Sequence, residues 1–131
     1  MRNKDVATVR RLLMHARYEV LPTPTIEAKV LESVPTSVPV TVTASPSMGL
    51  EQTVSTAERL AAAGYTVVPH LAARMVSGRA ELKDLADRLL AAGITTVFVP
   101  GGDADPVGDY KDALSMLEDL TALGKIGRAH V

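Results

Sequence analysis

Polar side chains interrupt or close three short apolar segments of this sequence. Glu19 lies within the first segment, Thr43 ends the second and His70 ends the third. A carboxyl group in apolar surroundings can donate a proton near neutral pH, which is the chemistry that Glu19 offers. The alternative of equal weight is a glutamate paired at the rim with Arg17 or Lys29. Thr43 and His70 can contact a ligand, although turn hydroxyls and lone histidines more often have structural roles.

A turn of two glycines and an aspartate follows the fourth apolar segment. Gly101 and Gly102 let a ligand approach the backbone closely, and Asp103 can then contact that ligand. Asp105 and Asp109 add two carboxylates to the same loop. Solvated turn aspartates are much commoner than metal ligands, and no histidine lies at metal-ligand spacing, so we predict no metal site.

The elements that must position these residues alternate between helices and strands. Apolar residues recur at helical spacing in five segments, separated by short runs of β-branched and aromatic residues. The expected strands cover 18–21, 38–43, 65–68 and 95–99. The residues expected to cap a helix from the position before it are Asp5, Thr25 and Ser77. The other two helices are expected to start at Leu50 and at Asp109.

A repeated six-residue pattern marks the ends of two expected helices. Residues 59–64 (RLAAAG) and 88–93 (RLLAAG) each lead into a strand that ends at a proline. Glycine is the usual residue just past a helix end, so both helices are expected to stop there. In the last helix the residues that keep the helical period are expected to share one face, namely Tyr110, Leu114, Leu117 and Thr121.

Apolar strands that alternate with helices are typical of a parallel sheet, so the predicted fold class is α/β. A parallel sheet of about four strands with alternating helices is half of a (β/α)8 TIM-type barrel, a fold of about 250 residues. An open doubly wound sheet explains the 131 residues equally well. In both folds the carboxyl ends of the strands carry the ligand, so the polar residues above are expected around one mouth.

The composition of the chain argues against some classes of binding partner. The net charge is −1 and the aromatic content is 3%, so we expect no nucleic-acid partner. No apolar run reaches the roughly 20 residues that span a bilayer, and residues 1–11 lead into no signal-peptide core. We therefore expect a cytoplasmic protein with a small-molecule partner and no membrane partner.

The order of these motifs resembles that of the methylenetetrahydrofolate reductase family. Residues 18–22 (YEVLP) are similar to the first-strand FEFFP of that family, and residues 40–43 (VTVT) to its second-strand VSVT. Residues 69–71 (PHL) match the PHL of its third strand, and residues 101–103 (GGD) stand where the family has RGD. The likeness covers residues 18 to about 123 in the order of the family.

The resemblance implies a flavin-dependent oxidoreductase of one-carbon metabolism that reduces 5,10-methylenetetrahydrofolate to 5-methyltetrahydrofolate. Its cofactor would be FAD and its electron donor NAD(P)H. If the matching residues have the same roles as in the family, Glu19 is the general acid that protonates the folate as its five-membered ring opens. Asp103 is then the second catalytic residue, which orients the pterin. The implied cofactor-binding residues are Thr43, His70, Gly101, Gly102 and Asp103.

The chain departs from the family pattern at two places. Gly101 replaces an arginine, and Val20 and Leu21 replace two aromatic residues, so the grip on flavin and the packing of the pterin are expected to differ. Two alternative functions stay open: a small α/β ligand-binding module, and a divergent folate-binding protein without reductase activity.

Residues 125–131 (KIGRAHV) resemble the translation of a sequencing adapter, so we treat them as a non-native tail. The domain is then expected to cover residues 1–124 as a partial barrel without strands five to eight. A half barrel leaves sheet edges unpaired, so we expect the fragment to be inactive alone. We also expect it to be unstable, to aggregate or to self-associate, and a homo-oligomer is one of these outcomes.

Overall fold

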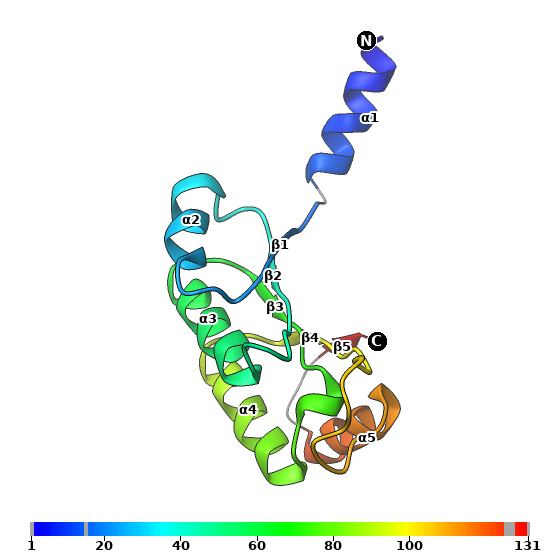
Figure 1. Cartoon of the computed structure of the whole chain (residues 1–131). Helices are drawn as coiled ribbons and strands as arrows, with labels where there is room; N and C mark the ends of the chain where they lie inside the picture. Colours follow the sequence, from blue (N-terminus) through cyan, green and yellow to red (C-terminus); the bar gives the residue numbers. More distant parts are fainter. Residues whose placement is uncertain (1, 15, 125–127, 131) are drawn as a thin grey trace.

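Helices and strands alternate along the chain in a computed structural model that describes residues 2–14, 16–124 and 128–130 (Figure 1). The predicted α/β class is confirmed. The helices are α1 (Asn3–Met14), α2 (Ile26–Ser33), α3 (Leu50–Ala62), α4 (Arg79–Ala91) and α5 (Ala113–Leu123), with a short 3-10 helix η1 (Ala73–Met75). The strands are β1 (Tyr18–Val20), β2 (Val40–Val42), β3 (Val67–Pro69), β4 (Thr96–Phe98) and β5 (Arg128–His130).

The described strands pair in parallel and in chain order. β1, β2 and β3 form one sheet, in which Glu19 is level with Thr41 and Thr41 is level with Val68. A parallel bridge joins His70, just after β3, to Phe98 in β4. The parallel arrangement therefore continues from β3 to β4, although β4 has its ladder with β5.

One face of the sheet is packed against helices, and α2, α3 and α4 lie along this side in Figure 1. Side chains alternate between the two faces of a strand, so every second strand residue points toward these helices. Val40, Val42 and Val97 are fully buried in this way, against Leu60 of α3 and Leu89 of α4. Each such side chain contributes about 1.5–3 kcal/mol when it leaves water, so this layer holds the fold together.

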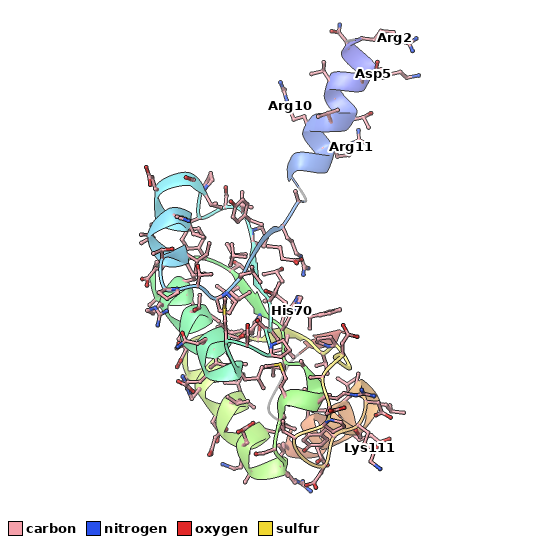
Figure 2. The ribbon with its side chains drawn as sticks, in the orientation of Figure 1. Arg2, Asp5, Arg10, Arg11, His70 and Lys111 are labelled. Carbon is pink, nitrogen blue, oxygen red and sulfur yellow. The ribbon has the colours of Figure 1, made fainter. Side chains whose placement is uncertain are left out.

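Helix α1 extends away from the rest of the chain in Figure 1. All the side chains of residues 2–11 are exposed, including Val6 and Val9, and Figure 2 shows Arg10 and Arg11 projecting from the helix. The helix begins at Asn3, so Asp5 lies in its first turn and the prediction that Asp5 precedes the helix was wrong.

The starts of α4 and α5 lie later than predicted. Gly78, and not Ser77, precedes α4. Asp112, and not Asp109, precedes α5, where its Oδ1 accepts a hydrogen bond from the backbone N–H of Ser115 at 2.9 Å. Several serines and aspartates near a helix start are equally able to cap it, so residue type alone did not identify the one in position.

The predicted apolar face of α5 was wrong by one residue. The buried residues are Ala113, Met116 and Leu120, whereas Leu114 is 64% exposed. Tyr110 is buried but precedes the helix. Apolar residues occur on more than one side of α5, so their spacing did not define a single buried face.

The repeated six-residue pattern ends α3 and α4 in the same way, as predicted. Gly64 and Gly93 follow the two helices with φ angles of 100° and 81°. The residue after each glycine donates its backbone N–H to a carbonyl of the last helical turn, at 3.2 and 2.9 Å. This left-handed turn favours glycine, which has no Cβ to clash with the backbone.

Part of the predicted non-native tail forms a strand. Its residues Arg128–His130 pair with β4 as β5, level with Thr96–Phe98. Residues 125–127 and 131 of the predicted tail lie outside the described residues. Among the described helices, none combines the length and the apolar character that a membrane crossing requires.

Replacement of Gly108 by alanine is expected to destabilise the fold. A Cβ at Gly108 would overlap the backbone carbonyl group of Ser77, whereas a Cβ at Gly101 would meet no atom within 4 Å. Forced overlap in a packed region costs about 1–3 kcal/mol. Urea denaturation should therefore give a lower midpoint for Gly108→Ala and an unchanged or slightly higher one for the control Gly101→Ala. Equal midpoints for the two variants would contradict the close packing of the 103–111 loop on Ser77.

Candidate functional site

A cavity of about 290 Å³ lies where β3 and β4 end. His70 follows β3 directly, Phe98 ends β4, and both line the cavity. Gly102 and Asp103 reach it from the loop after β4. The structure therefore brings together three of the residues predicted from the sequence, namely His70, Gly102 and Asp103.

Backbone hydrogen bonds beyond β3 and β4 keep the walls of this cavity side by side. Leu71 donates its N–H to the carbonyl of Phe98 at 2.8 Å. The N–H of Ala73 donates to the carbonyl of Pro100 at 2.9 Å, and the N–H of Arg74 donates to the carbonyl of Gly101 at 3.3 Å. This parallel pairing fixes the start of the Gly-Gly-Asp turn relative to His70.

Arg74, which was not predicted from the sequence, also lines the cavity. Its Nε donates to the carbonyl of Lys111 at 2.9 Å, and its Nη1 to the carbonyl of Ala104 at 3.4 Å. Its own carbonyl accepts the N–H of Val107 at 3.0 Å. Arg74 therefore anchors the 103–111 loop at three places. The available signal was its position in the loop between β3 and α4, at the carboxyl end of the sheet.

His70 is half-buried and stacks obliquely on Phe98, with ring centroids 4.8 Å apart and an interplanar angle of 47°. Figure 2 shows His70 in the middle of the strand layer. Burial lowers the pKa of His70 below its ordinary value, and the negative charge of Glu19 partly offsets this effect. A neutral imidazole can both donate and accept a hydrogen bond, so His70 is suited to contact a polar ring.

Glu19 borders a second, shallower hollow of about 260 Å³ on the sheet face opposite the helices. Arg17 and Thr41 line it too, and it shares His70 and Phe98 with the first cavity. Glu19 and Asp103 therefore lie at two adjoining hollows and not in one. The side chain of Glu19 is exposed, so of the two alternatives given equal weight the buried carboxyl was wrong. β1 is at the edge of the described sheet, so Glu19 is exposed although Thr41, level with it on β2, is buried.

Thr43 and Gly101 are not among the residues that line these two hollows. Thr43 Oγ1 donates to the carbonyl of Val20 at 3.2 Å, and the carbonyl of Thr43 accepts from Thr53 Oγ1 at 3.0 Å. These bonds tie the end of β2 to β1 and to α3, so they give Thr43 a structural role. The carbonyl of Gly101 is occupied by the N–H of Arg74.

The carboxylates of the loop after β4 differ in position and in the contacts that they make. Asp103 reaches the cavity, Asp112 caps α5, and Asp105 and Asp109 are exposed. Across the described residues, no three side chains of His, Asp or Glu gather as they would around a metal ion.

The imidazole of His70 is expected to titrate below about 6.5, the ordinary value for histidine. Glu19→Gln removes a charge that raises this pKa, so it should move the titration further down. Because the pKa is depressed in the folded state, stability is unaffected above about pH 6.5 and decreases as the pH falls toward the folded-state pKa. Histidine ring resonances followed by NMR against pH measure the shift, and Glu32→Gln on α2 is the control. A pKa at or above 6.5 in the wild type would reject the burial argument.

Compared with models of known protein families, the chain matches none. The likeness to the reductase family therefore depends on the four motifs and on where the fold positions them. Two of the four, at His70 and at Gly102-Asp103, meet in one cavity, and a third, at Glu19, borders the adjoining hollow.

Proposed function

We propose that this chain forms the first half of a (β/α)8 reductase barrel that reduces 5,10-methylenetetrahydrofolate to 5-methyltetrahydrofolate. Two features of the fold support the half barrel over a doubly wound sheet. The parallel strands are adjacent in chain order, and α2, α3 and α4 lie on one side of them (Figure 1). A doubly wound sheet reverses its strand order at a switch point and carries helices on both faces.

The observation that carries the proposal is the convergence of motif residues at the strand ends. His70, Gly102 and Asp103 line one cavity, and Glu19 borders the hollow beside it. His70 and Phe98 form the wall between the two. A ligand that lies across this wall would contact both carboxylates, as a substrate held between a proton donor and an orienting group requires.

The described residues do not form a complete FAD site. A cavity of about 290 Å³ lies at the lower limit of ligand pockets, which measure about 300–1,000 Å³. Gly101 has no side chain where the family has arginine, and the hydroxyl of Thr43 is bonded to β1. This half of the barrel would hold one flat ring beside His70 and Phe98. FAD and NAD(P)H remain part of the proposal as the redox partners implied by the resemblance, and the other half would have to contribute their remaining contacts.

In the proposed barrel Glu19 donates a proton to the folate as its five-membered ring opens. Its exposure on the uncovered sheet face supports this role, because a second half barrel would close over that face and exclude water from it. Asp103 accepts hydrogen bonds from the pterin and holds it in place.

Glu19→Gln is expected to lower the formation of 5-methyltetrahydrofolate by about 10²–10⁴-fold, the usual contribution of a general acid. The assay uses the full-length product of the gene, and not the 131-residue chain alone, with FAD and NADH or NADPH supplied. Asp103→Asn should also lower the rate, while Glu32→Gln and Asp105→Asn, which change exposed carboxylates outside both hollows, should not.

The outcomes of this assay separate the alternatives. Wild-type activity of Glu19→Gln would reject Glu19 as the acid. A wild-type protein that binds folate without reducing it would be a folate-binding protein, and one that does neither would reject the resemblance.

The 131-residue chain purified alone is expected neither to retain flavin nor to oxidise reduced nicotinamide. The reason is that no described helix covers the sheet face beside Glu19 and that the cavity is small (Figure 1). The absorbance of the purified protein near 450 nm and the loss of NADH absorbance measure the two properties. Stoichiometric bound flavin would contradict the prediction that the second half is needed.

A further inference from the structure

The cavity at the ends of β3 and β4 combines a flat wall with two opposite charges. The rings of His70 and Phe98 form the flat part, and Met75 adds apolar surface. Among its lining residues the charged ones are Arg74 and Asp103. Such a cavity suits a flat heteroaromatic ring that carries polar groups of both signs on its edge.

The guanidinium group of Arg74 is oriented before any ligand arrives. It has five N–H donors, and Nε and Nη1 each donate one bond, to the carbonyls of Lys111 and Ala104. Its backbone is fixed on both sides as well, through Gly101 and Val107. A ligand that binds the remaining N–H donors of this group would therefore lose little affinity to side-chain ordering.

Arg74 forms no direct ion pair within the described part of the chain, although the carboxylate of Asp112 is near enough to interact with its charge. The ion pairs found there belong to Arg2, Arg59, Lys83 and Arg88. Arg74 is half-buried, and both of its side-chain bonds are to neutral carbonyl groups. A half-buried cation without a direct ion pair keeps capacity for one, and an anionic ligand group would add that direct partner to the more distant charge of Asp112.

We propose that Arg74 is the anion-recognising residue of this cavity and selects flat heteroaromatic ligands that carry a carboxylate. The planar guanidinium can donate two parallel hydrogen bonds to a carboxylate, which gives direction as well as charge. Asp103 meets the N–H donors on the ring. The ring part of this assignment rests on the proposed function, whereas the carboxylate part rests on Arg74 alone.

Two pterins that differ in one group test the inference. Pterin-6-carboxylate and 6-methylpterin share the ring, and calorimetry on the protein as its gene encodes it measures the dissociation constant of each. We expect the carboxylate to bind at least about 10-fold more tightly to the wild type. Arg74→Gln should remove this difference. Lys111→Gln, which removes a nearby exposed charge that does not line the cavity, should keep it.

A second variant separates recognition from support of the loop. Arg74→Lys keeps the charge but not the fork of donors, so it should retain a reduced preference for the carboxylate. If Arg74 only held the 103–111 loop, both Arg74 variants would weaken the two pterins equally, which would overturn the inference. Equal binding of the two pterins to the wild type would overturn it too and leave the ring site intact. Failure of the wild type to bind either pterin would overturn the ring site, and with it both proposals.

Discussion

The pairing of the chain after β3 with the chain after β4 is the constraint on which the candidate site depends. Three backbone hydrogen bonds, donated by Leu71, Ala73 and Arg74, continue the parallel arrangement past the ends of the strands. Each bond is worth only about 0.5–1.5 kcal/mol, but together they fix direction and register. Without them His70 and the turn that carries Asp103 would leave the sheet independently, and the cavity between them would not form.

The two faces of the sheet have different roles: one packs against helices and stabilises the fold, and the other carries candidate site residues. Val40, Val42 and Val97 face the helices and are fully buried, so this side cannot change without loss of packing. The opposite face carries the exposed carboxylate of Glu19 beside Thr41, Val68 and Phe98. Polar groups beside apolar surface suit a wall that meets a ligand, and in the proposed barrel this face would become the inner wall.

Predictions from the sequence were accurate where a local rule had one solution. Gly64 and Gly93 end their helices because the left-handed turn strongly favours glycine. They were inaccurate where several residues obeyed the rule equally. Asp109 and Asp112 were both able to cap α5, and apolar residues on several sides of this helix allowed the choice of Leu114 in place of its buried neighbour.

The sequence by itself determined the α/β class, the order of the elements, the two glycine-terminated helices and the clustering of His70 and Asp103 at strand ends. These properties follow from backbone preferences and side-chain periodicity, which depend on near neighbours in the chain. Only the tertiary structure decided that Glu19 is exposed and that Arg74 completes the cavity wall. Burial and proximity depend on which distant segments pack together, and the sequence of a single strand or loop does not identify those segments.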